Sequence, residues 1–162
     1  MNKSGNVITI ERSDNMLNFI RAIFIALMAH FGQVNEKDGR SYYFHILGVT
    51  AGVRGISTKT VAVLHDVIED ADYSIEDFRF LDGEQREALN LVTHYPEDSY
   101  EEYVEKIKSS PMATEIKLSD LRNNMSTTKK NLYKSKDYEK LDKYRKAYKI
   151  LTENSEVNDG KE

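Results

Sequence analysis

The chain contains no cysteine among its 162 residues, which excludes disulfides, thiolate nucleophiles and cysteine-based metal sites. Any metal site would therefore be built from histidine and carboxylate groups. Basic residues are outnumbered by acidic ones, 23 to 27, so the net charge is −4 and no overall positive field attracts nucleic acid. We therefore expect no nucleic-acid partner, and any phosphate-binding site must be local.

Long apolar runs are also absent. The strongest one, residues 16–31, is too short to span a bilayer and carries Arg21, and the first fifteen residues lack the apolar core of a secretory signal. We expect a cytoplasmic protein with no membrane partner. The sequence carries no signal for the oligomeric state.

Proline and glycine are scarce, with two and eight residues, and the apolar spacing is mostly helical, which predicts an all-α protein. A chain of this length can bury roughly two-thirds of its unfolded surface as one domain. We expect an N-terminal extension at 1–12, a single domain at 13–152 and a disordered polar tail at 153–162. A strand at residues 7–10 stays open as an alternative.

Capping signals and apolar spacing predict where the helices lie. Ser13 and Asp14 can cap a helix that runs through Phe31, with an inward stripe of Leu17, Ile20, Phe24, Leu27 and Met28. Capping boxes at Ser74 with Asp77 and at Ser99 with Glu102 predict two short helices. The remaining helices are expected at 42–53, from about 57 to 71, and at 83–95, 111–133 and 138–151.

One apolar segment, residues 61–74, carries four titratable groups in its middle. On a helix His65 and Glu69 are one turn apart, as are Asp66 and Asp70, so all four side chains share one half of the helix. Burying that set without partners would cost several kcal/mol. A divalent cation would offset the charge, since imidazole and carboxylate ligands suit Mn, Fe, Zn or Mg.

Two more residues could complete such a site. His45 lies in the apolar segment YYFHILGV, and Asp120 lies in EIKLSDLRNN, where apolar residues otherwise mark a packed helix. Taken singly, each is more often a hydrogen-bonded core residue than a metal ligand. The metal hypothesis therefore depends on the whole set, which is spread over three predicted helices.

These residues belong to a series of motifs: AHFGQ and KDGRSYYFH within 29–45, LHDVIED at 64–70, VTHYPEDSYEEYVEKI at 92–107 and IKLSDLRNN at 116–124. Through them the chain resembles the HD-domain metal-dependent phosphohydrolases. It is most similar in pattern to the hydrolase domain of bifunctional alarmone synthetase/hydrolases and to small stand-alone alarmone hydrolases. The resemblance covers most of the chain and implies a single HD-domain helical bundle.

The resemblance also implies a role for ten residues. The ligands of one divalent metal ion, most often Mn²⁺ in this branch, would be His45, His65, Asp66 and Asp120. The catalytic acidic pair, which polarises water and handles protons, would be Glu69 and Asp70. The contacts to a small phosphorylated nucleotide would come from Lys37, Tyr42, Asn124 and Thr127.

The implied activity is removal of the 3′-pyrophosphate from guanosine tetra- or pentaphosphate, (p)ppGpp, by metal-activated water. Glu36 stands where relatives usually carry an arginine that frames the guanine. This difference favours an alternative, hydrolysis of another phosphorylated nucleotide such as the 2′-phosphate of NADPH or a nucleotide signal. A non-catalytic nucleotide-binding HD protein is the third reading, although such a protein would not need the acidic pair.

The two remaining histidines are interpreted as structural. His30 is expected at the end of the first helix, where capping or core packing is favoured over catalysis. His94 precedes Tyr95 and Pro96 and is interpreted as a surface loop residue.

Overall fold

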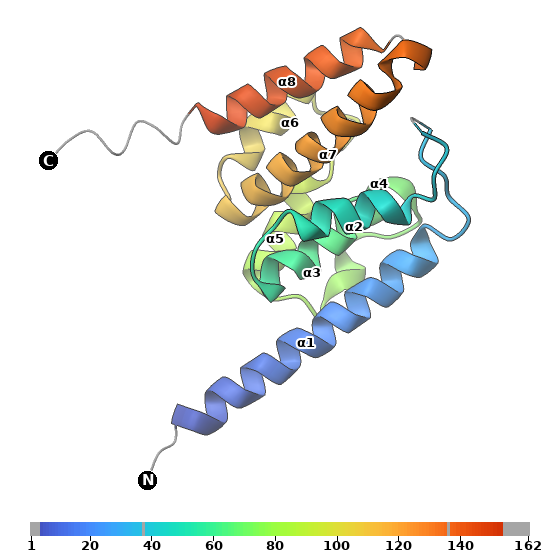
Figure 1. The fold of residues 1–162 in the computed structure, drawn as a ribbon. Coiled ribbons are helices and arrows are strands. Elements are labelled where there is room, and N and C mark those ends of the chain that lie inside the picture. Colours follow the sequence, from blue (N-terminus) through green and yellow to red (C-terminus); the bar gives the residue numbers. More distant parts are fainter. Residues whose placement is uncertain (1–3, 37, 136, 154–162) are drawn as a thin grey trace, which may run out of the picture.

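The structure is a computed structural model that describes residues 4–153, except Lys37 and Lys136. The predicted substrate contact Lys37 therefore lies outside the described residues. Over these ranges the chain is a bundle of helices, and the only β-type pairing there is a single bridge between Val34 and Ser41. The all-α prediction is confirmed (Figure 1). In chain order the elements are α1 (Ser4–Ala29), α2 (Tyr43–Ala51), α3 (Ile56–Leu64), α4 (Val67–Asp70), η1 (Ile75–Phe78), α5 (Gly83–Val92), α6 (Tyr100–Ile107), α7 (Pro111–Ser135) and α8 (Tyr138–Thr152).

Helix α3 occupies the middle of the bundle. It contacts α1, α2, α5 and α7, while α8 lies along α7 and α6 (Figure 1). Val61, Ala62 and Leu64 of α3 have no exposed surface. A helix buried on all sides needs apolar residues around its whole circumference, which explains the nearly continuous apolar run of this segment.

Helix α1 differs from its prediction in two ways. It begins at Ser4, so the predicted caps Ser13 and Asp14 lie inside the helix, and residues 7–10 are helical. The predicted inward stripe is wrong, because its five residues are between 44% and 65% exposed. The buried positions are instead Ala22 and Ala26, whose small side chains allow α1 to lie close against α3.

The segment with the titratable groups is interrupted where one helix was predicted. Helix α3 ends at Leu64, and the short helix α4 begins at Val67, so His65 and Asp66 form the turn between them. Both residues keep right-handed helical dihedrals, and the backbone N–H of Asp70 still donates to the Asp66 carbonyl at 2.9 Å. The regular helix is therefore interrupted at the two residues that were expected to bind metal.

The predicted capping boxes are confirmed. Ser74 and Asp77 form one at η1, and Ser99 and Glu102 form one at α6. The Oγ atom of Ser110 accepts from the backbone N–H of Ala113 at 3.2 Å, as expected for the start of α7. Another capping box, formed by Asp82 and Gln85 at α5, was not predicted.

Gly48 of α2 and Gly52, the C-cap residue of that helix, allow α2 to lie against α7. A Cβ atom at Gly48 would stand 2.1 Å from the Nδ2 atom of Asn123, and one at Gly52 would stand 2.1 Å from the Oγ atom of Ser119. The same Ser119 hydroxyl donates to the carbonyl of Val49 at 2.8 Å. This close packing brings the polar residues of α2 and α7 together.

Among the helices of the described part of the chain, none has both the length and the apolar character that crossing a membrane requires.

Candidate metal centre

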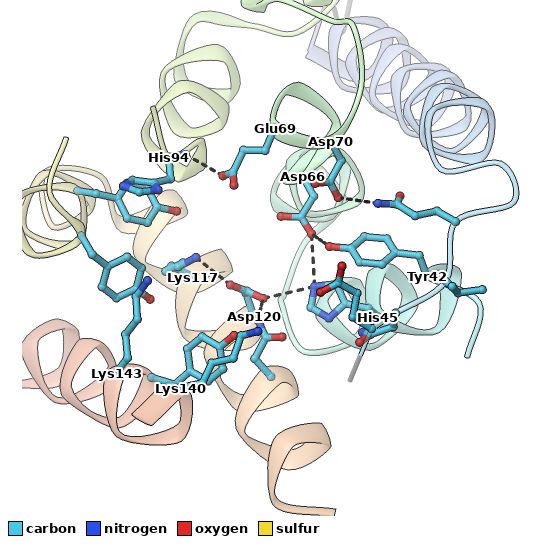
Figure 2. A pocket seen from close by; sticks show the side chains of 18 of the residues that line it. Tyr42, His45, Asp66, Glu69, Asp70, His94, Lys117, Asp120, Lys140 and Lys143 are labelled. Atoms are coloured by element: carbon cyan, nitrogen blue, oxygen red, sulfur yellow. Dashed lines mark hydrogen bonds and ion pairs between the residues drawn. The ribbon is translucent and has the colours of Figure 1, made fainter. Parts of the chain in front are cut away.

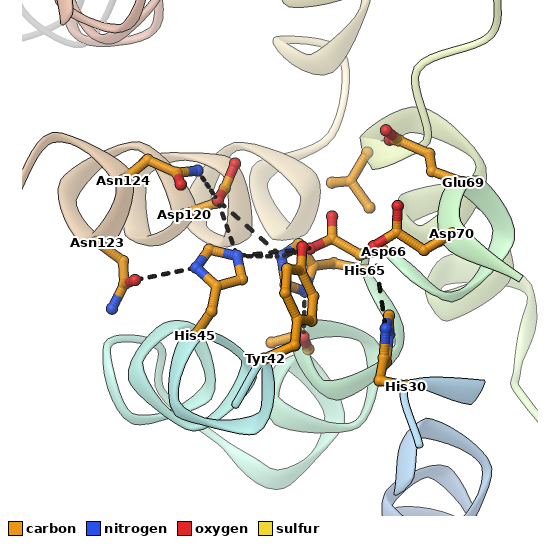
Figure 3. Close-up of polar contacts among 12 residues, drawn as sticks. His30, Tyr42, His45, His65, Asp66, Glu69, Asp70, Asp120, Asn123 and Asn124 are labelled. Atoms are coloured by element: carbon orange, nitrogen blue, oxygen red, sulfur yellow. Dashed lines mark hydrogen bonds and ion pairs between the residues drawn. The ribbon is translucent and has the colours of Figure 1, made fainter. Parts of the chain in front are cut away.

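The four predicted metal ligands meet at one point, although they come from α2, the α3–α4 turn and α7 (Figure 3). The Nε2 atom of His45 lies 3.3 Å from the Nε2 atom of His65. The same His45 nitrogen lies 3.4 Å from an oxygen of Asp66 and 3.4 Å from an oxygen of Asp120. The Nε2 atom of His65 lies 3.0 Å from Asp66.

Hydrogen bonds at the far side of each ring fix how the imidazoles face the site. The Nδ1–H group of His65 donates to the carbonyl of Ala62 at 2.8 Å, and that of His45 donates to the Oδ1 atom of Asn123 at 2.9 Å. When the rings are neutral, both Nε2 lone pairs therefore point at one another. Two facing lone pairs at this separation repel unless a cation or a proton lies between them.

The electrostatics of the group also favour positive charge. Burial disfavours a charged His45, but hydrogen bonds to Asp120 and Asp66 outweigh it and raise the pKa of His45 to about 10. Burial likewise opposes ionisation of Asp66, yet the neighbouring histidines hold the pKa of its carboxyl well below the ordinary value. Both shifts favour positive charge at this point, which is what a divalent cation would supply; imidazole nitrogens would have to be free of protons to bind it.

The donor set fits a divalent metal ion. One ligand atom each from His45, His65 and Asp120 lies within 4.8 Å of the others, and all three residues are buried. Asp66 adds a carboxylate oxygen beside both imidazoles. Two imidazole nitrogens with two carboxylate oxygens match the preferences of Mn, Fe or Zn.

Lys117 is a residue of this site that the sequence analysis missed. Its Nζ atom lies 2.9 Å from one oxygen of Asp120, while the other oxygen of Asp120 faces His45. Burial disfavours the charged lysine, but Asp120 more than compensates and raises the pKa of Lys117 well above its ordinary value. The signal was present in the sequence, because a lysine one turn before an aspartate lies on the same helix face.

The acidic pair of α4 lies next to this group, and neighbouring residues hold both side chains (Figure 2). An oxygen of Glu69 accepts from the backbone N–H of His94 at 2.7 Å. An oxygen of Asp70 accepts from the side-chain amide of Gln33 at 3.3 Å. Desolvation by the surrounding protein, with the Asp66 carboxylate nearby, raises the pKa of both Glu69 and Asp70.

The two other histidines lie next to this acidic pair. The Nδ1 atom of His30 lies 3.9 Å from an oxygen of Asp70, and the backbone of His94 bonds Glu69. His30 is buried, as expected for core packing, and its ring stacks on Tyr42 with 4.9 Å between the centroids. His94 is a loop residue, as expected, but it is half-buried and not on the open surface. The centroid of its ring lies 4.8 Å from that of Tyr103, and its backbone N–H donates to Glu69.

A cavity of about 770 Å³ opens over the metal group (Figure 2). On one side it is lined by the acidic pair, by Asp66 and Asp120, and by two predicted substrate contacts, Tyr42 and Asn124. The hydroxyl of Tyr42 donates to Asp66 at 2.5 Å, and the amide of Asn124 donates to Asp120 at 2.5 Å. Both residues therefore also support the carboxylates of the metal group.

The opposite side of the cavity carries positive charge from α7 and α8. Lys140 and Lys143 of α8 line this side, and the Nζ atom of Lys143 lies 3.7 Å from the centroid of the Tyr100 ring; Lys117 of α7 also lines the cavity, next to its partner Asp120. Because a phosphorylated ligand needs cations at a distance from the acids, this division of charge suits a polyphosphate. Glu36 also lines the cavity.

Thr127, another predicted substrate contact, lies in a separate cavity of about 210 Å³. His45 and Asn35 line both cavities, so the smaller one adjoins the metal group. Its other walls include Asn123, Ser126 and Lys130. Thr127 is therefore near the site without facing the main cavity.

The helical bundle and its His/Asp group have the form of an HD-domain metal-dependent phosphohydrolase. No family model and no curated protein matches the chain. Among solved structures, the chain is similar to a metazoan ortholog of SpoT that hydrolyzes ppGpp and plays a role in starvation responses. The TM-score is 0.69 at 26% identity, over 86% of each chain. This likeness, with the His/Asp group, confirms the resemblance to the HD-domain phosphohydrolases drawn from the motifs.

Proposed function

We propose that this protein is a metal-dependent phosphohydrolase of the alarmone hydrolase type, which removes the 3′-pyrophosphate from (p)ppGpp. The observation that carries the proposal is the pair of imidazole lone pairs that converge with two carboxylates under a polar cavity. The structural neighbour that hydrolyzes ppGpp supports the choice of substrate.

His45, His65, Asp66 and Asp120 would hold one divalent ion, for which the family resemblance favours Mn²⁺. A divalent ion supplies Lewis-acid chemistry, since it polarises a phosphoryl oxygen and lowers the pKa of water. Lys117 would keep Asp120 ionised and oriented, because its ammonium occupies the carboxylate oxygen that faces away from the imidazoles. Asn123 would orient the ring of His45 by accepting a hydrogen bond from its Nδ1–H group.

Asp70 is our choice for the group that accepts the proton of the attacking water, with Glu69 orienting that water. Their raised pKa values bring both carboxyls closer to neutral pH, where a general base works best. The water oxygen would form a bond to the phosphorus nearest the ribose, and the bond from that phosphorus to the 3′ oxygen would break. The 3′ oxygen then takes a proton from solvent, which leaves GDP or GTP and pyrophosphate.

The remaining polar residues of the cavity would bind the nucleotide. Lys140 and Lys143 of α8 face the acidic pair across the cavity and can pair with phosphate oxygens. Tyr42 and Asn124 would frame the nucleoside from the metal side. Lys37 and Thr127 stay predictions from the family resemblance. A nucleotide substrate agrees with a cytoplasmic location.

Hydrolysis of another phosphorylated nucleotide is the second candidate function. Glu36, which stands where relatives carry a guanine-framing arginine, lines the cavity in this chain. A carboxylate at this position would repel a nearby phosphate and would favour a base other than guanine. NADPH, which would lose its 2′-phosphate, is one such substrate.

A product assay separates these candidates. Manganese-loaded protein is incubated with ppGpp, adenosine analogues, NADPH and cyclic nucleotides, and the released phosphate and pyrophosphate are measured separately. We expect pyrophosphate and GDP from ppGpp, and none from an Asp120→Ala control. Phosphate from NADPH alone would favour the second candidate, and no turnover of any compound would refute the enzymatic proposal.

A further inference from the structure

Helix α1 lies at the edge of the bundle (Figure 1). One of its sides is largely apolar and exposed to solvent. Five residues form what we call the outer seam: Leu17 is 63% exposed, Ile20 56%, Phe24 65%, Leu27 44% and Phe31 84%. Three further exposed apolar residues, Met16, Ile23 and Met28, flank it. Leu17, Ile20, Phe24, Leu27 and Met28 are the residues whose spacing had predicted a buried face.

The side of α1 that packs on the bundle is a different one. Ala22 and Ala26 are buried there, and Phe19 and Ile25 are packed against the core. Helix α1 is therefore apolar on two sides, and such helices are buried in their functional state. Between residues 15 and 29 the one charged residue is Arg21, whose guanidinium lies over the ring of Phe80 in the bundle.

The outer seam has the spacing of a helix-pairing surface. Its members follow one another at intervals of three, four, three and four residues, which is the a/d pattern of a coiled coil. The first four members span ten residues of α1, which is about 15 Å of helix length, and Phe31 lies in the turn that follows α1. A second helix with the same pattern can interlock with the seam along that whole length.

We propose that the occupant of the outer seam is the same seam of a second copy of this chain, so that the protein is a two-fold symmetric dimer joined through α1. In a two-fold symmetric interface the same patch of each copy faces the other. A seam with the coiled-coil pattern can therefore pair with its own copy. The absence of charge along the seam removes the like-charge repulsion that self-association would otherwise bring.

The area of the face agrees with this occupant. Eight apolar side chains with these exposures offer on the order of 800 Å², which exceeds the 300–600 Å² of the largest patch on a typical monomer and matches one side of a standard interface. A membrane surface fits less well, because amphipathic helices that lie on membranes carry lysine and arginine next to the apolar face.

The first test is the mass of the full chain in solution, measured by light scattering or sedimentation over a wide concentration range. We expect twice the chain mass of 18.7 kDa. Phe24→Glu should shift the mass to 18.7 kDa while the helical circular dichroism is retained, because residue 24 is exposed in the monomer. Tyr138→Glu on α8, at 63% exposure, is the matched control and should stay dimeric.

Three results would overturn the proposal. They are a wild-type mass of 18.7 kDa at every concentration, a dimer that persists in folded Phe24→Glu, and a monomer that binds neutral lipid vesicles through α1. The last result would assign the seam to a lipid surface.

A second test does not depend on the fold of the glutamate variant. Because the chain has no cysteine, Phe24→Cys carries a single thiol at the centre of the seam. In a two-fold dimer this thiol faces its own copy, so mild oxidation should give a covalent dimer on a non-reducing gel. Tyr138→Cys should remain monomeric on the same gel. Equal cross-linking of the two variants, or none at residue 24, would refute the proposed interface.

Discussion

Each imidazole of the candidate metal centre is oriented by a hydrogen bond at its Nδ1 atom, one to a backbone carbonyl and one to Asn123. These bonds leave both Nε2 lone pairs facing the carboxylates of Asp66 and Asp120. The sequence predicted the four converging residues because each interrupts an apolar stripe. The i,i+3 spacing of Lys117 and Asp120 was also in the sequence but was missed, whereas the bond from the His94 backbone to Glu69 could not be predicted, because it depends on how separate segments pack.

We expect that replacing Asp70 lowers the rate of catalysis without weakening metal binding. Asp70→Asn keeps a side chain that can still bond to Gln33 but cannot accept a proton, and the four proposed ligands are unchanged. We predict that the variant binds Mn²⁺ like the wild type while kcat falls about 10²- to 10⁴-fold, the usual contribution of general-base catalysis. Stopped-time product assays and metal analysis check this. Parallel losses of metal and rate would contradict the assignment.

The raised pKa values of Glu69 and Asp70 predict that, on the acid side of the pH profile, activity is lost at a higher pH than ordinary carboxyl groups would give. The carboxylate forms are the active ones, so kcat/KM should fall as pH drops through the raised values. The fall should begin above the ordinary values of 4.5 for glutamate and 3.8 for aspartate. A pH profile of kcat/KM with metal held saturating measures it. A profile that stays flat down to those ordinary values would argue against a role for this pair.

At the scale of elements, periodicity alone could not reveal two features of the fold. The predicted continuous helix ends at Leu64, so His65 and Asp66 point from a turn. Helix α1 is apolar on two sides, so its spacing predicted a helix but could not tell which side faces the core. The capping boxes at Ser74 and Ser99 were predictable because their bonds join residues three apart.

The close packing of α2 on α7 gives a prediction at this scale. In Gly48→Ala the new Cβ atom would collide with the amide of Asn123, which would have to move away from His45. We expect the affinity for Mn²⁺ to fall about 10- to 100-fold, as for other losses of a ligand's supporting hydrogen bond. Calorimetric titration measures the affinity. Gly83→Ala, which meets no atom within 4 Å, is the control and should bind metal normally.

At the scale of the whole molecule, the fold places opposite charges on the two sides of one cavity. Asp66, Glu69 and Asp70 come from α4 and the turn before it, Lys140 and Lys143 come from α8, and α7 contributes the ion pair of Lys117 with Asp120. The metal group lies at the floor, where three helical segments meet. The sequence predicted the class of fold from composition and motifs, whereas the cavity and its lysines follow only from the way α8 lies along α7.

The central claim is that His45, His65, Asp66 and Asp120 together bind one divalent cation. The most direct test is calorimetric titration of chelator-treated protein with Mn²⁺, on the wild type and on His65→Ala and Asp120→Ala variants whose circular dichroism is unchanged. The account predicts one ion per wild-type chain and no measurable uptake by either variant. Absence of binding by the wild type, or unchanged binding by both variants, would contradict it.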